Sequence, residues 1–221
     1  MTAWERCADR TLTLDQFNTD PCLIAVDLAT KTDIAAVIFL FERDGKLIPF
    51  GRFYVPEAAF DVPHQATYRG WAAQGRMIVT PGNIIDFERI EADILEATTR
   101  FRVGEISYDP WRATQLATRL QTQGARVIEF RQTVANFSEP TKQLDALMRS
   151  GKIAHDGNPV LAWMIGNVVG HYDAKENVYP RKERPENKID GAVALIMALG
   201  RHMVFEEEPS LDEFLKNAVM V

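Results

Sequence analysis

The run Ile24-Ala25-Val26-Asp27-Leu28 decides how the chain is expected to fold, because it places one carboxylate at the end of an apolar segment. Residues 22–28 predict a buried strand. The β-branched and aromatic residues of 34–41 predict a second strand, and the alternation over 47–55 predicts a third. Asp44-Gly45 separates the last two strands and is a strong hairpin signal. The three strands are therefore expected to form an antiparallel meander.

Beyond the meander, short strands alternate with helical segments. We expect strands at 77–80, 105–108 and 126–130, helices at 63–73, 86–102, 111–123, 139–149, 159–169 and 188–201, a small hairpin at 172–181 and a short helix at 210–216. This order predicts an α/β fold, a mixed sheet in which parallel strands follow the meander, with helices on both faces. The strand after the meander should pair parallel to the first. The carboxyl ends of strands one and four would then lie side by side, where α/β sheets place their sites.

The composition is that of a soluble globular protein. The chain has 221 residues, of which 46% are hydrophobic and 25% charged. These values exclude general disorder, a collagen-like fibre and a small disulfide-rich scaffold. No apolar run approaches the ~20 residues that span a bilayer, and residues 1–20 contain no signal-peptide segment. We therefore expect a soluble, cytoplasmic protein without a membrane partner.

Two further global features concern partners and metals. The net charge of −6 argues mildly against a nucleic-acid partner, although a binding groove needs only local positive charge. Cys7 and Cys22 have no CxxC or histidine partner at zinc-ligand spacing. Two free thiols are expected, with one disulfide as the alternative.

Three aspartates have positions that suit a metal-dependent active site. Asp27 and Asp109 each end an expected strand, and Asp190 lies near the start of the last long helix. Each also has a structural interpretation. Asp27 could accept amides of the following turn, and Asp109, before Pro110, could cap a helix. Asp190 could be a first-turn acid in a capping box with Asn187 as the cap.

The face of the last helix favours the functional interpretation of Asp190. Asp190 aligns with Ala194 and Ala198, and Gly191 and Ala192 flank the helix start. Such small residues let a helix pack closely on a sheet. The side chain of Asp190, on the same face of the helix, would then point toward the sheet and not toward water. Three converging carboxylates repel one another unless cations neutralise them. Two divalent cations, Mg²⁺ or Mn²⁺, about 3.5–4 Å apart, would activate a water and stabilise the leaving 3′ oxygen in phosphodiester cleavage.

Other side chains are weaker candidates. Asp33 and His155 are auxiliary candidates for contact with metal or phosphate, although a turn residue and a structural histidine are the ordinary interpretations. Trp111 is expected in the core rather than as a stacking platform. A basic loop interrupted by prolines precedes Asp190, and we expect it to bind DNA beside the site; its cationic residues are Arg181, Lys182, Arg184 and Lys188.

An ordered series of motifs runs through residues 4–201. It comprises 25–28 with the following hairpin, Thr80-Pro81-Gly82 leading to Asp86, Ile106-Ser107-Tyr108-Asp109-Pro110-Trp111, 155–161, Asn177 with Pro180, and Lys188-Ile189-Asp190-Gly191. In this series the chain resembles the C-terminal nuclease domain of tailed-phage terminase large subunits of the HK97-like type.

The resemblance implies an RNase H-like fold and a metal-dependent endonuclease that cuts concatemeric double-stranded viral DNA during genome packaging. Carried over by position, Asp27, Asp109 and Asp190 match the acidic catalytic and metal-binding triad of the family, which takes two divalent cations. The implied partners are double-stranded DNA, the terminase ATPase domain, the small terminase subunit and the portal. The implied location is the cytoplasm of the host cell.

The sequence departs from the family pattern in one respect. Full-length members carry an N-terminal packaging ATPase, and this chain contains no P-loop motif. We therefore expect an isolated domain, a truncated protein or one part of a split gene. Residues 1–20 are expected to be a lead-in from the interdomain region, 21–203 the nuclease domain and 204–221 a C-terminal tail.

Other functions stay open on the residues alone. An actin-like or sugar-kinase-like ATPase also begins with an aspartate-ended strand and a hairpin, but it usually has glycines in that turn. The turn here is Ala29-Thr30-Lys31-Thr32. A non-catalytic module that docks the packaging motor to its portal would use the aspartates only as caps and turn residues. Another RNase H-like nuclease, such as a resolvase or an RNA–DNA hybrid nuclease, would share the chemistry of the site.

Overall fold

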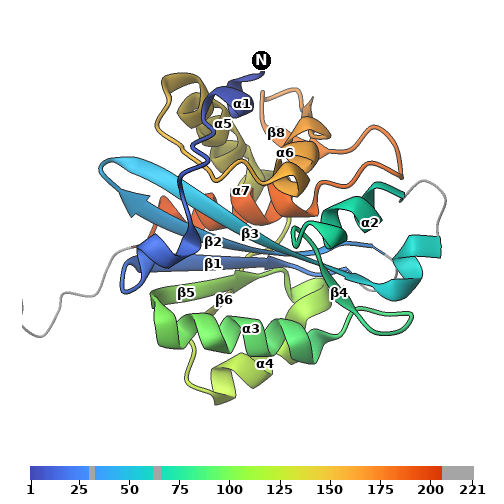
Figure 1. The fold of residues 1–221 in the computed structure, drawn as a ribbon. Coiled ribbons are helices and arrows are strands. Elements are labelled where there is room, and N and C mark those ends of the chain that lie inside the picture. Colours follow the sequence, from blue (N-terminus) through green and yellow to red (C-terminus); the bar gives the residue numbers. More distant parts are fainter. Residues whose placement is uncertain (30–32, 62–65, 206–221) are drawn as a thin grey trace, which may run out of the picture.

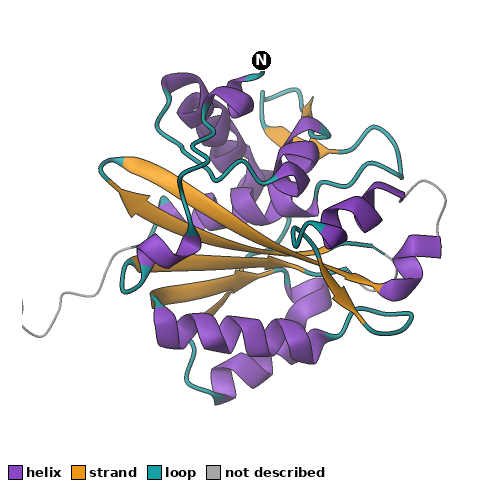
Figure 2. Ribbon diagram, in the orientation of Figure 1, coloured by secondary structure: helices purple, strands orange, loops and turns teal. Residues whose placement is uncertain are grey.

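A mixed sheet with the strand order β4-β3-β2-β1-β5-β6 forms the centre of the protein, between two layers of helices (Figures 1 and 2). The computed structural model describes residues 1–29, 33–61 and 66–205. The predicted α/β architecture, with a meander, parallel strands and helices on both faces, is confirmed. None of the helices in these ranges is long and apolar enough to cross a membrane.

The meander consists of β1 (Pro21–Asp27), β2 (Ala35–Arg43) and β3 (Lys46–Pro56). Asp44 and Gly45 both have positive φ, 53° and 69°, as a two-residue hairpin turn of type I′ requires. The predicted hairpin is therefore confirmed. β1 and β2 are buried over nearly all their length. Because helices cover both faces of the sheet, their apolar runs are continuous instead of alternating.

Three further strands extend the sheet in parallel pairings. β5 (Arg102–Tyr108) pairs with β1, and β6 (Val127–Glu129) pairs with β5. β4 (Ile78–Thr80) pairs instead with β3. The strand expected beside β1 is therefore the fifth in the chain and not the fourth. The carboxyl ends of β1, β5 and β6 meet at the same edge of the sheet.

Seven α-helices, two short 3₁₀ helices and a separate hairpin complete the described fold. The α-helices are α1 (Ala3–Arg6), α2 (Ala66–Ala73), α3 (Phe87–Arg100), α4 (Pro110–Thr122), α5 (Val134–Ser150), α6 (Pro159–Gly166) and α7 (Asp190–His202). The 3₁₀ helices are Leu14–Phe17 and Glu57–Asp61, and the hairpin is β7 (Val169–Tyr172) with β8 (Val178–Arg181). α7 packs on β1 and β2 and is backed by α5 and α6, whereas α3 and α4 lie on the opposite face (Figure 1).

Several predicted boundaries are wrong for local reasons. α5 begins at Val134 rather than at 139, because the Thr133 side chain caps it by accepting the Asn136 N–H. α6 ends at Gly166 rather than at 169, and the hairpin therefore begins earlier than expected. The first residues of the predicted helix 63–73 and the whole of the predicted helix 210–216 lie outside the described residues.

The N-terminal residues pack onto the domain. Trp4 and Phe17 are buried, and Ala8 forms a bridge with His155. Cys7 and Cys22 are buried free thiols, which confirms that expectation. The lead-in segment therefore contributes to both hydrophobic cores, one on each face of the sheet.

Candidate active site

A cleft of about 560 Å³ lies where β1, β5 and α7 come together. Asp27 is the last residue of β1, Asp109 directly follows β5, and Asp190 is the first residue of α7. All three line the cleft. The other lining residues are Trp111, Gln132, Tyr179, Pro180, Arg181, Lys182, Ile189 and Val193. The fold thus brings together three aspartates that are far apart in the sequence.

Asp27 is half-buried and is held by a neighbour that the sequence analysis missed. Gln132 Nε2 donates a hydrogen bond to Asp27 Oδ1 at 3.0 Å. Gln132 follows β6, the third strand whose carboxyl end reaches this edge. Sites in α/β sheets lie at the carboxyl ends of parallel strands, and this rule pointed to Asp27 and Asp109. Applied also to the predicted strand 126–130, the same rule would have found Gln132.

Asp109 caps α4, as its structural interpretation predicted. Its Oδ1 accepts the Trp111 N–H at 3.4 Å, and Pro110 occupies the first turn. The cap bond described here uses Oδ1 and not the second carboxylate oxygen. Capping and a role in the cleft are therefore compatible.

The prediction that Trp111 lies in the core is wrong. The side chain is 87% exposed and lines the cleft. The buried stripe of α4 is formed by Ala113, Leu116 and Leu120, and Trp111 lies off that stripe. Because α4 packs on the sheet through this buried stripe, the indole of Trp111 points into solvent.

Asp190 is not part of a capping box. The N-cap of α7 is Ile189, which makes no side-chain cap bond, so the predicted cap at Asn187 is wrong. Asn187 lies in the preceding loop, where its N–H donates to the Arg184 carbonyl. The helix therefore begins later than the predicted cap implies, and Asp190 is its first residue.

The expected close approach of α7 to the sheet is confirmed at Gly191. A Cβ atom at this position would lie 2.7 Å from the Phe53 ring of β3 and 2.8 Å from Met164 Sδ of α6. Real Cβ atoms do not come this close to such neighbours, so glycine is required here. The contact holds the N-terminus of α7, and with it Asp190, against the sheet.

The carboxyl group of Asp190 is short of positive charge. Burial raises its pKa to about 7, and the nearby Asp33 carboxylate adds to the rise, while Lys182 and Lys188 act in the opposite direction. A strongly raised pKa in a cleft is typical of functional carboxyl groups. A bound cation would favour the charged form of this group.

Asp33 and Lys188 form an ion pair beside the cleft, with 2.7 Å between Lys188 Nζ and Asp33 Oδ1. Neither is among the lining residues. Lys188 is only 8% exposed and its charge is paired with Asp33, so the structure does not place it among the cations of the cleft, and its role in DNA binding stays a prediction. Of the remaining loop cations, Arg181 and Lys182 line the cleft and Arg184 is exposed outside it.

His155 is a structural residue away from the cleft. It is buried, and its ring stacks on Trp4 with 4.0 Å between the centroids. Nδ1 accepts the Gly157 N–H at 3.1 Å, so Nε2 carries the proton and donates to the Trp4 carbonyl at 3.0 Å. Burial lowers the pKa of His155. Both ring nitrogens are used, which favours the structural interpretation, and the auxiliary metal role stays an untested prediction.

The three aspartate carboxylates of the cleft are chemically suitable ligands for hard divalent cations, because Mg²⁺ and Mn²⁺ prefer carboxylate oxygens. Within residues 1–29, 33–61 and 66–205, however, no three acidic, histidine or cysteine side chains stand close enough to hold one ion. Like-charged carboxylates separate when no cation lies between them. Metal binding therefore requires the three aspartates to turn toward one another.

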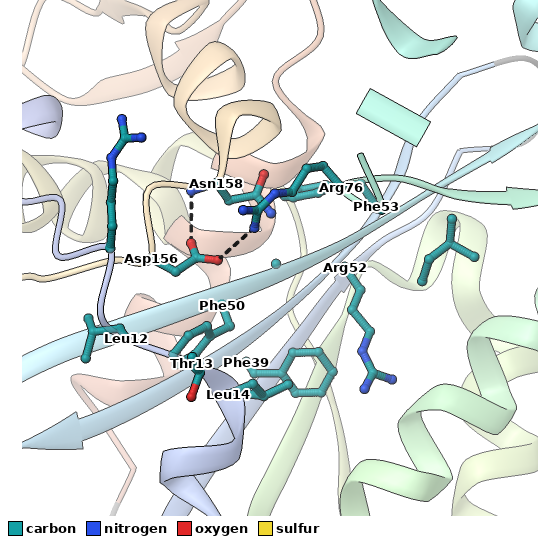
Figure 3. A pocket seen from close by; sticks show the side chains of 14 residues that line it. Leu12, Thr13, Leu14, Phe39, Phe50, Arg52, Phe53, Arg76, Asp156 and Asn158 are labelled. Atoms are coloured by element: carbon teal, nitrogen blue, oxygen red, sulfur yellow. Dashed lines mark hydrogen bonds and ion pairs between the residues drawn. The ribbon is translucent and has the colours of Figure 1, made fainter. Parts of the chain in front are cut away.

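A second cavity, of about 370 Å³, lies beside Gly51 of β3 (Figure 3). The lining residues include a single carboxylate, that of Asp156, and it is already engaged. Its Oδ1 accepts the Asn158 N–H at 3.0 Å, and its Oδ2 lies 3.8 Å from Arg76 (Figure 3). This cavity therefore offers no cluster of acids, and the aspartate cleft is the candidate active site.

Comparisons with known proteins agree over nearly the whole chain. Residues 2–206 match the family described as terminase large subunit, endonuclease domain. The chain is 37% identical to protein YmfN of Escherichia coli (strain K12), over 98% of this chain and 51% of YmfN. It is 27% identical to the terminase large subunit of Enterobacteria phage HK97, over 97% of this chain and 43% of that protein. The chain spans about half the length of these curated relatives.

Solved structures give the same result. The crystal structure of the HK97 bacteriophage large terminase superposes with a TM-score of 0.79 at 27% identity, covering 90% of this chain and 42% of that one. The large terminase nuclease of thermophilic phage G20c has a TM-score of 0.57 at 13% identity, covering 82% and 83%. Terminase nuclease domains are RNase H-like, which confirms the predicted fold. The chain therefore belongs to the family of terminase large subunit endonuclease domains.

Proposed function

We propose that this chain is a metal-dependent endonuclease that cuts concatemeric double-stranded viral DNA during genome packaging. The observation that carries the proposal is the lining of one cleft by Asp27, Asp109 and Asp190. Membership of the endonuclease family supports it. A further support is the G20c terminase nuclease, a protein of the same fold at 12% identity and a TM-score of 0.56, whose structure was solved with bound magnesium.

Asp27, Asp109 and Asp190 would hold two divalent cations, Mg²⁺ or Mn²⁺. When bound, such cations would activate a water and stabilise the leaving 3′ oxygen of the cut strand. The chain's own groups prepare the site. The hydrogen bond from Gln132 orients the carboxylate of Asp27, and the hydrogen bond from the Trp111 N–H orients the carboxylate of Asp109. Asp190 brings a carboxyl group that the protein leaves short of counter-charge.

Arg181 and Lys182 would bind the phosphates of double-stranded DNA in the same cleft, with exposed Arg184 farther along the loop. By family membership, the other partners would be the terminase ATPase domain, the small terminase subunit and the portal, in the host cytoplasm. Because the chain spans about half of its curated relatives, the complete packaging reaction belongs to longer proteins. Cleavage is the activity proposed for this part.

Plasmid cleavage with Mg²⁺ or Mn²⁺, and with EDTA, tests the proposal. The decisive variant is Asp109→Asn, which keeps a capping side chain but removes the charge. The matched control is Asp86→Asn, because Asp86 caps α3 through the Glu88 N–H at 2.9 Å and lies outside the cleft. We expect Asp109→Asn to stop cleavage while the fold is kept, and Asp86→Asn to cut like the wild type.

The alternatives make different predictions in the same assays. If Asp109→Asn cuts like the wild type, the aspartates are caps and turn residues, as in a docking module. Preference for a four-way junction or an RNA–DNA hybrid over duplex DNA would indicate another RNase H-like nuclease. Tight binding of magnesium–ATP would indicate an actin-like ATPase.

A further inference from the structure

Trp111 presents a large apolar surface to water at the aspartate cleft. Its 87% exposure is the highest of any described aromatic side chain. The other tryptophans have packing roles, because Trp4 is buried and Trp71 and Trp163 contact each other with 5.3 Å between ring centroids. Single exposed apolar side chains are common on protein surfaces, but this one lies in the same cleft as Asp27, Asp109 and Asp190.

The backbone of Trp111 is fixed beside the candidate active site. It lies in the first turn of α4, directly after Pro110, and its N–H donates to the carboxylate of Asp109. The indole and this carboxylate are thus carried on the same rigid helix start. Any molecule that contacts the indole in the cleft is also placed relative to Asp109.

The rest of the cleft has the chemistry of a nucleic-acid groove. Arg181 and Lys182 line it together with Trp111. Lysine and arginine neutralise phosphates, and exposed aromatic rings stack on bases or pack on sugars. On an unpaired strand this stacking does not depend on the identity of the base, because every base has a π-face. Against a paired duplex the same ring packs on the sugars. An aromatic ring with two cations therefore fits a DNA strand better than it fits an apolar protein partner.

We propose that Trp111 is a substrate-binding residue whose indole packs against the sugar, and at an unpaired position the base, of the nucleotide beside the scissile phosphate. This inference rests on the proposed nuclease function of the cleft. Arg181 and Lys182 hold neighbouring phosphates, and the indole adds affinity for the strand beside Asp109. The contact is independent of base sequence.

Steady-state cleavage of linear duplex DNA tests the role through three variants. Trp111→Ala should raise KM by about tenfold, within the range found when one base-stacking contact is removed, with little change in kcat. Trp111→Phe keeps an aromatic face and should restore KM to within about threefold of the wild type. Ile84→Ala is the control, because Ile84 is also exposed but lies outside the cleft, and its KM should not change.

A spectroscopic measurement separates contact from a structural role. In the Asp109→Asn background with Mg²⁺, duplex DNA should protect tryptophan fluorescence from acrylamide quenching, and the protection should be absent when Trp111→Phe is added. If Trp111→Ala fails to fold, the comparison of quenching protection with and without Trp111→Phe is enough to decide whether the indole contacts DNA. DNA binding without protection, or an unchanged KM in Trp111→Ala, would overturn the inference. So would a shift of the emission with protein concentration in the absence of DNA, which would assign the indole to contact with a second copy.

Failure of the nuclease proposal has a different signature. A wild-type protein that binds DNA without cutting it would contradict the proposed function. The protection measurement would then still decide whether Trp111 contacts DNA.

Discussion

The two ends of helix α7 lie beside carboxylates in opposite electrostatic surroundings. Near the C-terminus, Arg201 donates two hydrogen bonds to Glu105 of β5, at 2.5 and 3.2 Å, and the Glu105 side chain is fully buried. At the N-terminus, burial and the Asp33 carboxylate raise the pKa of Asp190 to about 7. A buried acid with its own counter-ion is part of the fold, whereas a half-buried acid that lines a cleft and is short of counter-charge can receive a cation.

Removing the charge at the N-terminal end should have the largest effect. We expect Asp190→Asn to lower kcat for DNA cleavage by roughly 10²–10³-fold, as loss of one preorganised electrostatic group does. Asp145→Asn is the control, because Asp145 is an exposed acid on α5 that pairs with Arg149. Cleavage rates at saturating Mg²⁺ measure the effect. Wild-type activity in Asp190→Asn would place the metal site elsewhere.

Breaking the pair at the C-terminal end should affect stability instead. Arg201→Ala leaves Glu105 buried and unpaired, and we expect a loss of about 3–5 kcal/mol in the free energy of unfolding. Urea denaturation measures it. Arg149→Ala, which breaks the exposed pair with Asp145, should cost less than about 1 kcal/mol. A similar cost for both variants would show that Arg201 does not compensate a buried charge.

The two ends should also differ in their response to pH. Because the pKa of Asp190 is raised to about 7 in the fold from 3.8, the unfolded chain loses this proton more readily. The contribution of Asp190 to the stability of the metal-free protein should therefore fall as pH rises from about 4 to about 7, and level off above. Asp190→Asn lacks this loss, so its Tm should match the wild type near pH 4 and exceed it near pH 8.

Two features make this pH comparison specific. His155, whose pKa is lowered by burial, destabilises the fold at low pH in both proteins and cancels in the difference. Added Mg²⁺ should remove the advantage of the variant, because it stabilises only the charged wild-type site. A constant Tm difference across this pH range would contradict the raised pKa.

The smallest effect should come from the basic loop, where Lys182 lines the cleft and Lys188 is buried against Asp33. Lys182→Ala should reduce the slope of log Kd against log salt by about one for duplex DNA. Lys188→Ala should leave the slope unchanged and lower the Tm. Binding titrations at several salt concentrations measure both. A wild-type slope for Lys182→Ala would mean that Lys182 contacts no phosphate, and a reduced slope for Lys188→Ala would mean that Lys188 does.

Much of the site could be predicted because its signals are local. The apolar run of β1 ending in Asp27 and the Asp44-Gly45 turn depend on neighbouring residues only. Since parallel strands end at one edge, Asp109 could be placed beside Asp27 as soon as β5 was expected next to β1. The small residues after Asp190 correctly indicated close packing against the sheet.

Other residues could not be assigned from their neighbours. Lys182 and Lys188 belong to the same basic loop, yet only Lys188 meets Asp33. His155 looked available to a ligand until Trp4, from the other end of the chain, was found stacked on its ring. In both cases the partner is distant in sequence, and its position depends on how whole elements pack.

The amino-acid order alone established the α/β class, the hairpin and the strand ends that carry Asp27 and Asp109, because periodicity and turn chemistry act over a few residues. Only the packed molecule decided that Trp111 faces water, that Lys188 is neutralised and that Asp190 has a raised pKa. Exposure, ion pairing and desolvation are properties of surroundings. Those surroundings are assembled from segments that lie far apart in the sequence, as Asp33 and Lys188 do.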